Sequence, residues 1–268
     1  MYLALKYLKK LLNVLLGFFL IIFLLIFAIF AVSHDSNIQD SKLQTLEKIL
    51  PFSMNDKDIT YNKKEEVAQT IAKNNYRSMT AGERTEVINR AKSMAEVNWT
   101  PKYDIYDDKG NFTFKKGKTY SGIPYSMDLT QAKSSEDFLN KIKDSNDLYG
   151  NDCSGYVSAA WGIKRQTTLS LYDAVKSGTP VDGKLVCQIP WEDLQLGDAL
   201  LVEDGKGKGH IMLYIDTDKN NSDNLNVYEQ NIQTSVPYFP LPTARRDVRS
   251  KSTLIKIGYF PIRLLRTS

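Results

Sequence analysis

An apolar run near the N-terminus divides this chain into two parts of different character. The 22 residues from Leu11 to Val32 are almost entirely Leu, Ile, Phe, Val and Ala, interrupted only by Asn13 and Gly17. At a rise of about 1.5 Å per residue, a helix of this length crosses a hydrocarbon core of about 30 Å. The run therefore predicts an N-terminal transmembrane helix, and the remaining residues must supply any globular domain.

The flanks of the run indicate its orientation. Lys6, Lys9 and Lys10 precede it, and positive charges in this position stay on the cytoplasmic side of the membrane. We therefore expect a single-pass protein of the cell membrane whose remaining chain is extracytoplasmic. The residues 31–33 also resemble a signal-peptide cleavage site, so a secreted protein is the alternative. A signal core is normally about 7–15 residues long, which favours the retained anchor.

The rest of the chain carries almost no net charge. Removing the three lysines that precede the apolar run from the net charge of +4 leaves +1 for residues 34–268. A nucleic-acid-binding protein normally presents a basic patch, so this balance argues against that class of partner. The two histidines and two cysteines of the chain form no cluster of metal ligands, and we expect neither a metal nor a cofactor.

Changes of pattern suggest four regions. Residues 1–33 are the tail and membrane anchor (or signal peptide), and residues 34–62 read as a stalk with one amphipathic helix from Leu43 to Leu50. Residues 63–118 are expected to form a helical and hairpin lobe, and residues 119–268 the main domain. We expect the protein to be a monomer.

The lobe has two recognisable parts. Apolar residues at helical spacing predict two helices between Lys63 and Asn98, and Thr80-Ala81-Gly82-Glu83 has the pattern of a capping box that opens the second one. Residues 102–122 alternate aromatic and polar side chains around the turn sequence 107–111, which predicts a β-hairpin.

The main domain begins with helices and ends with strands. The expected helices are Ser135–Ile142, one starting near Cys153, and Thr168–Lys176, which Gly178 ends. The expected strands are Ala199–Val202, His210–Ile215, Leu225–Asn231 and Leu254–Ile262. Helices followed by an antiparallel meander predict an α+β fold.

One stretch of this domain is suited to carry a nucleophile. Polar turn residues from Gly150 lead into Cys153 and then into small and apolar residues up to Trp161. Asp152 or Asn151 can cap the helix, and the free N–H groups and positive dipole end of its first turn favour a thiolate. The same N–H groups are placed to stabilise an oxyanion once the sulfur has attacked a carbonyl.

The base for this thiol has few candidates. His210 begins a strand after a glycine-rich loop, whereas His34 lies two residues after the end of the apolar run. A cysteine at a helix N-terminus that faces a histidine on a strand can form a thiolate–imidazolium pair. A single cysteine or a single histidine is more often a structural residue than a catalytic one. Cys187 is expected to be a buried apolar residue, with a disulfide to Cys153 as the less favoured alternative.

A catalytic histidine also needs a residue that orients its ring. On the strand Leu225–Asn231, alternation places Glu229 and Asn231 on one face and Gln230 on the other. Alternation does not decide which face is turned toward His210. We select Glu229 because a carboxylate best holds an imidazolium, and we keep Gln230 and Asn231 as alternatives.

Four segments, in this order, resemble the NlpC-type cysteine peptidases of bacterial cell walls. They are Pro124-Tyr125, Asp152-Cys153-Ser154-Gly155-Tyr156-Val157, Asp193-Leu194-Gln195-Leu196-Gly197-Asp198-Ala199-Leu200 and Gly209-His210-Ile211-Met212-Leu213-Tyr214-Ile215. The resemblance implies that residues 119–268 form a papain-like domain, with the nucleophile helix packed on an antiparallel β-sheet.

The resemblance also implies an activity. Members of this family hydrolyse amide bonds in peptidoglycan stem peptides, commonly beside a D-amino acid, so the expected partner is a peptidoglycan peptide. By carry-over, Cys153 is the nucleophile and His210 the general base. Tyr125 supports the site near the oxyanion, and Asp152 and Ser154 are supporting neighbours of the nucleophile.

The segment Tyr228-Glu229-Gln230-Asn231 departs from the family, whose third residue is often a histidine. It is closer to the related CHAP amidases, in which Glu and Asn support the histidine, and this favours Glu229. Two other functions remain open for the chain. One is an inactive, membrane-tethered module that binds or scaffolds the cell wall, and the other is an acyl or peptidyl transferase that uses the same three residues.

Overall fold

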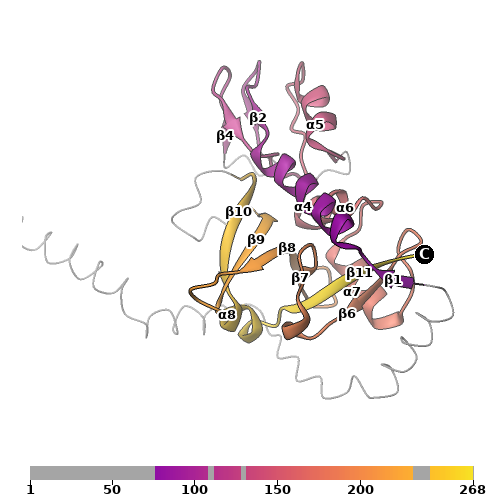
Figure 1. Cartoon of the computed structure of the whole chain (residues 1–268). Coiled ribbons are helices and arrows are strands. Elements are labelled where there is room, and N and C mark those ends of the chain that lie inside the picture. The colour runs from indigo at the N-terminus through magenta and orange to yellow at the C-terminus, as the bar shows by residue number, and fades with distance from the viewer. Residues whose placement is uncertain (1–75, 108–111, 128–130, 232–241, 268) are drawn as a thin grey trace, which may run out of the picture. The chain divides into compact units, whose positions relative to one another are not determined.

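The computed structural model describes residues 76–107, 112–127, 131–231 and 242–267 (Figure 1). Their largest feature is a seven-stranded antiparallel sheet with the strand order β1-β11-β7-β8-β9-β10, in which β6 also pairs with β11. These strands are β1 (Tyr76–Ser78), β6 (Leu185–Gln188), β7 (Ala199–Glu203), β8 (Gly209–Thr217), β9 (Asn224–Gln230), β10 (Ala244–Ser250) and β11 (Phe260–Thr267).

Helices and short hairpins complete the described fold. The helices are α4 (Ala81–Glu96), α5 (Ser135–Ile142), α6 (Cys153–Trp161), α7 (Thr168–Ser177) and α8 (Lys251–Lys256), with a 3-10 turn η1 (Trp191–Asp193). Two short sheets pair β2 (Asn98–Trp99) with β5 (Tyr120–Ser121), and β3 (Ile105–Tyr106) with β4 (Thr113–Phe114). The β3–β4 pair confirms the predicted hairpin.

The predicted fold class needs a correction at its N-terminal end, where a transmembrane helix was expected. In the part of the chain that the structure describes, no helix is long and apolar enough to span a membrane. A span needs about 20 mainly apolar residues, whereas α4, the longest described helix, has 16 and carries several charges. The observed class is a mixed α/β domain with a large antiparallel sheet. The run 11–32 and the stalk 34–62 lie outside the described residues.

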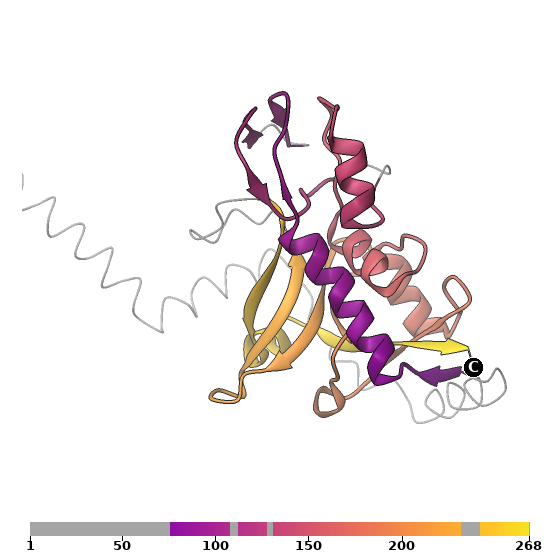
Figure 2. The ribbon, with the colours of Figure 1, turned by 45° about the horizontal axis from the view of Figure 1, so that its top comes forward.

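Helix α6 packs beside α4 and contacts β8 and β9, while α4 contacts β9 and β10 (Figures 1 and 2). Eight of its nine residues are buried, which explains a composition that is apolar or small on every side. Its polar groups are satisfied internally. The Tyr156 hydroxyl donates to the Ala91 carbonyl at 2.8 Å, and Trp161 Nε1 donates to the Gly197 carbonyl at 2.9 Å. The helix is therefore fixed both to α4 and to the turn before β7.

The strands divide their side chains between two hydrophobic clusters, as the two-residue period of a strand requires. Leu201, Ile211 and Tyr228 belong to the cluster that also contains the buried residues of α4, α6 and α7. Their neighbours in sequence belong to a second cluster that includes Leu254 of α8; they are Leu200, Met212 and Val227. The sheet is thus covered on both faces, and α4 shares one core with α6.

A buried carboxylate ties three segments of the fold together. Asp198, in the turn before β7, accepts hydrogen bonds from Arg84 of α4 at 2.9 Å and from Arg263 of β11 at 2.7 Å. It also accepts one from the Gln195 backbone N–H at 2.9 Å. The turn that resembles a cell-wall peptidase motif therefore acts here as a structural junction.

Two sequence predictions about secondary structure are wrong. Residues Leu254–Ile262 were expected to be one strand, but 251–256 form α8, and β11 begins only at Phe260. Ser250 caps α8 by accepting a hydrogen bond from the Thr253 N–H at 3.2 Å. Residues 76–78 were included in a helical region, but they form β1 because they pair with residues 265–267 of β11. That pairing partner is too distant in sequence for a local pattern to reveal.

Candidate active site

Asp152 places Cys153 at the first position of α6. Its Oδ1 accepts hydrogen bonds from the Gly155 N–H at 2.6 Å and from the Ser154 hydroxyl at 3.3 Å. Its Oδ2 accepts one from Arg165 Nη2 at 2.6 Å. Of the two cap candidates in the sequence, Asp152 is therefore the one observed. Ser154 belongs to the cap, and Cys153 is 7% exposed.

The loop that leads into Cys153 is held by the segment 124–126. The Asn151 N–H donates to the Pro124 carbonyl at 3.1 Å, and the Ser126 N–H donates to the Asn151 carbonyl at 3.1 Å. The two segments approach so closely at Gly150 that a Cβ atom there would lie 2.0 Å from the Pro124 carbonyl oxygen. Only glycine fits this crossing without moving the backbone.

Tyr125 lies in this same supporting segment and pairs with Asn151 in a parallel bridge. Its hydroxyl donates to Met127 Sδ at 3.1 Å. The structure therefore places Tyr125, the predicted supporting residue, beside the loop that enters α6, and its role near an oxyanion stays a prediction.

His210 lies at the start of β8 between Cys153 and Glu229. Its Nε2 is 3.3 Å from Glu229 Oε2, and its side chain is 16% exposed. Burial lowers the pKa of His210, but the negative charge and hydrogen bond of Cys153, together with those of Glu229, outweigh burial and raise this pKa to about 9. Because Nε2 faces the carboxylate, the ring has Nδ1 left for the sulfur.

Glu229 is fully buried and is surrounded by positive groups. Its Oε1 accepts hydrogen bonds from Nη2 of both Arg245 and Arg249. Burial raises the pKa of this carboxyl, but the hydrogen bond and charge of His210 and the charges of Arg249 and Arg245 lower it to about 2. The carboxylate is therefore ionised at neutral pH and fixed at both oxygens.

The two alternatives to Glu229 lie elsewhere. Gln230 is fully buried on the opposite side of β9, and its Nε2 donates to the Ile123 carbonyl at 2.9 Å and the Pro124 carbonyl at 2.5 Å. The Asn231 carbonyl accepts a hydrogen bond from Arg245 Nη1 at 3.4 Å. Gln230 thus connects β9 to the segment beside the loop before Cys153, and it is Glu229 that the structure brings to the ring of His210.

Sequence reasoning missed Arg245 and Arg249. Both lie on β10, which pairs with β9 so that Arg245 is directly opposite Glu229. The signal was present as alternating charges at Arg245, Asp247 and Arg249, but no strand was expected there. An Arg-Asp-Arg pattern of period two would have predicted a charged strand face.

Tyr259, between α8 and β11, was also missed. Its ring packs edge-to-face against His210, with 6.5 Å between ring centroids and 79° between planes. Burial, followed by the negative charges of Glu229 and Cys153, raises the pKa of Tyr259, so the phenol remains protonated. Tyr259 was missed because Leu254–Ile262 was predicted to be one strand, so no loop was expected to lie against His210.

The second cysteine has a different environment. Cys187 lies on β6, where its Sγ is 3.8 Å from the Arg263 carbonyl oxygen, and burial raises its pKa to about 11. Both cysteines are free thiols. Within residues 76–107, 112–127, 131–231 and 242–267, no group of three or more His, Cys, Asp and Glu side chains is arranged to hold a metal ion.

Comparisons with known proteins identify no relative. No model of a known protein family matches the chain, and neither a curated protein nor a solved structure does.

Proposed function

We propose that the chain is a cysteine hydrolase that cleaves amide bonds in peptidoglycan stem peptides. The observation that carries this proposal is the alignment of Cys153, His210 and Glu229, in which a buried carboxylate lies 3.3 Å from the imidazole that interacts with the thiol. The substrate class is supported by the four segments that resemble NlpC-type peptidases. Such a substrate implies that the domain acts outside the cytoplasm.

The first chemical step forms a bond between the sulfur and the substrate. The Cys153 thiolate attacks the carbonyl carbon of the amide, and the carbonyl π electrons move to the oxygen. Because Asp152 occupies the N–H of Gly155, the N–H groups of Cys153 and Ser154 are left at the helix end for this oxyanion.

The following steps use His210 as both acid and base. The imidazolium gives its proton to the leaving amine as the C–N bond breaks, which produces a thioester on Cys153 and a free amine. The neutral ring then takes a proton from water, and the hydroxide attacks the thioester. The thiolate leaves, and a carboxylic acid is released. Glu229 stabilises the imidazolium that is present before and after each turnover.

Digestion of purified muropeptides, followed by mass spectrometry, tests the proposal. Wild-type protein should convert a peptide into two fragments whose summed mass exceeds that of the substrate by one water. Cys153→Ala should give no products, whereas the matched variant Cys187→Ala should retain activity, because Cys187 lies on β6 with a raised pKa.

Two outcomes would assign another function. If added amine acceptors appear in the products in place of water, the protein is a transferase on the same residues. If wild type and Cys153→Ala are equally without effect on every muropeptide, the hydrolase proposal is wrong, and a wall-binding module is the remaining reading.

A further inference from the structure

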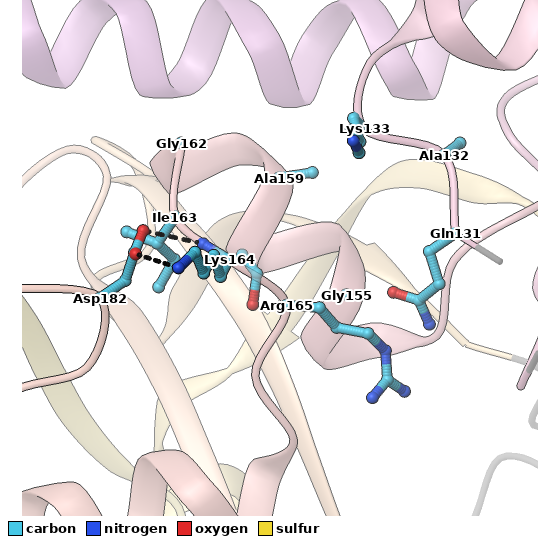
Figure 3. Close-up of a pocket in the computed structure, with 11 residues that line it drawn as sticks. Gln131, Ala132, Lys133, Gly155, Ala159, Gly162, Ile163, Lys164, Arg165 and Asp182 are labelled. Carbon is cyan, nitrogen blue, oxygen red and sulfur yellow. Dashed lines mark hydrogen bonds and ion pairs between the residues drawn. The ribbon is translucent and has the colours of Figure 1, made fainter. Parts of the chain in front are cut away.

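A pocket lies on one side of the nucleophile helix, and we call it the α6 pocket (Figure 3). It has a volume of about 480 Å³ and is lined by residues 131–133, one face of α6, residues 162–165 and Asp182. Pockets of roughly 300–1,000 Å³ are typical of sites that bind small organic molecules. The α6 pocket is therefore large enough for a ligand of the size of one or two amino acids.

The α6 pocket does not include the thiol. The helix contributes Gly155, Ser158 and Ala159, which share one face because they recur at helical spacing, and its C-cap Gly162 also lines the pocket. Cys153 precedes Gly155 by two residues, or about 200° around the helix, so its side chain points away from this face. A ligand in the α6 pocket would leave the catalytic cysteine unoccupied.

Three buried polar atoms at this pocket have no hydrogen-bond partner within the described residues. They are Gln131 Nε2, Gln131 Oε1 and Arg165 Nε. Figure 3 shows the amide of Gln131 and the guanidinium of Arg165 extending toward the same end of the pocket. The amide also presses on the helix, since a Cβ atom at Gly155 would lie 1.8 Å from Gln131 Oε1. A buried donor or acceptor without a partner is costly, so a ligand that satisfies these atoms gains affinity.

The charges at this end of the pocket favour an anion. Lys133, Lys164 and Arg165 line the pocket with a single acid, Asp182. At the other end, Lys164 and Asp182 pair with each other at 3.7 Å. Arg165 is likewise paired, since its Nη2 donates to Asp152 at 2.6 Å, but its Nε has no partner among the described residues. With both pairs counted, the excess positive charge of the lining comes from Lys133.

We infer that the α6 pocket binds the free carboxyl-terminal residue of a peptide. The carboxylate accepts hydrogen bonds from Arg165 Nε and Gln131 Nε2, with the ammonium of Lys133 nearby. The N–H of the same terminal residue donates to Gln131 Oε1. The small residues Ala159 and Gly162 leave room for the peptide backbone beside the Gln131 amide, which itself fills the space at Gly155. This site does not depend on the proposed hydrolysis, because no step involves the thiol.

Binding can be measured without turnover by ¹⁵N NMR on the full chain carrying Cys153→Ala. The probes are N-acetyl-alanyl-alanine in its D,D and L,L forms, and the same dipeptides as C-terminal amides. We expect at least one of the two acids to shift the Gln131 side-chain amide and the Arg165 Nε–H signals. The corresponding carboxamide should bind at least about tenfold more weakly, because hydrogen bonds to a charged group contribute more than neutral ones.

A matched pair of variants locates the site. Gln131→Glu has the same shape but puts a negative charge against the ligand, and it should weaken binding of the acid about tenfold or more. Gln188→Glu makes the same chemical change at an exposed position of β6 and should leave binding unchanged. Absence of shifts with all four probes overturns the inference, and so does equal binding of acid and amide or wild-type affinity in Gln131→Glu. Because Cys153→Ala is used throughout, a failure of the hydrolase proposal does not alter these results.

Discussion

His210 Nε2 lies 3.3 Å from Glu229 Oε2, and the second oxygen of that buried carboxylate accepts hydrogen bonds from Arg245 and Arg249. One carboxylate is thus held between an imidazole and two guanidinium groups. The arginines keep Glu229 ionised, and the ionised carboxylate in turn fixes the ring of His210 and favours its protonated form. The negative charge that supports the ring of His210 therefore depends on β10, the strand that carries both arginines.

The pH dependence of hydrolysis should show this coupling. His210 has a pKa raised to about 9, so the imidazolium is present below this pH and is lost as the pH rises through it. We expect kcat/KM to fall above about pH 9. In Glu229→Gln the fall should occur at lower pH, because the charge and hydrogen bond that raise the pKa of His210 are weakened, and activity should drop by about 10²-fold or more.

The control for Glu229→Gln is the exposed residue Glu136 on α5. Glu136→Gln should have the wild-type pH profile. An unchanged alkaline limb in Glu229→Gln would show that Glu229 does not act on His210.

The two thiols should differ in their rates of alkylation. At pH 6, iodoacetamide should label Cys153 much faster than Cys187, whose pKa is raised to about 11 by burial and which therefore has almost no thiolate at that pH. His210→Ala should slow labelling of Cys153 because it removes the imidazolium partner. Peptide mapping by mass spectrometry measures both rates in one sample. Equal, slow labelling of the two cysteines in the native protein would argue against an activated nucleophile.

Replacing Tyr259 should separate the effect of its ring from that of its hydroxyl. Tyr259→Phe keeps the edge-to-face contact with His210 and should retain activity within a few-fold. Tyr259→Leu removes a contact of about 0.5–1.5 kcal/mol and should lower kcat/KM by about 2- to 10-fold, with a shift in the alkaline limb of the pH profile.

Tyr103, which is 52% exposed, gives the matched control, and Tyr103→Leu should be without effect on kcat/KM. If Tyr259→Leu lowers stability but leaves the pH profile and the rate unchanged, the ring does not position His210.

Asp198 should be among the residues most important for stability. Asp198→Ala leaves the buried Arg84 and the partly buried Arg263 without their shared carboxylate, and breaking a buried ion pair in this way costs about 3–5 kcal/mol of unfolding free energy. Urea unfolding followed by circular dichroism measures the loss. Asp173→Ala, at an exposed position of α7, should stay within about 0.5 kcal/mol of wild type. A similarly small change for Asp198→Ala would mean that the surrounding side chains compensate for the lost carboxylate.

Local sequence signals predicted several elements closely. The capping box of Thr80 and Glu83 is present at the start of α4, and α5 spans the predicted residues Ser135–Ile142. The predicted end of α7 is confirmed, with Gly178 in the left-handed conformation at its C-cap. These features depend on residues that are neighbours in sequence, and the chemistry of a cap or a helical face is therefore visible without the fold.

Other elements depend on partners that are distant in sequence. β1 is three residues long and forms by pairing with the C-terminal β11, and β6 pairs with the same strand. β10 was missed because its alternating charges do not follow the usual apolar pattern of a strand. Arg245 and Arg249 are partly covered because they face Glu229.

The residues of the candidate site also differ in how far the sequence alone could identify them. Cys153 and His210 were identified from a helix-start pattern and from the scarcity of histidines, both of which are visible in the sequence. The choice among Glu229, Gln230 and Asn231 required knowing which face of β9 is turned toward His210. That face is set by the packing of neighbouring strands, as the alternate burial of Val227 and Tyr228 in different clusters shows.

The close crossing at Gly150 has a consequence for any mutational screen of this protein. A Cβ atom there would collide with the Pro124 carbonyl oxygen at 2.0 Å, and backbone atoms cannot rotate away as a side chain can. A library scored by hydrolysis would therefore show position 150 to be as intolerant as position 153, although a glycine contributes no reactive group. Fitness at such a position reports the spacing between two segments of the backbone. A parallel measurement of the amount of folded protein is needed to distinguish this structural effect from a loss of catalysis.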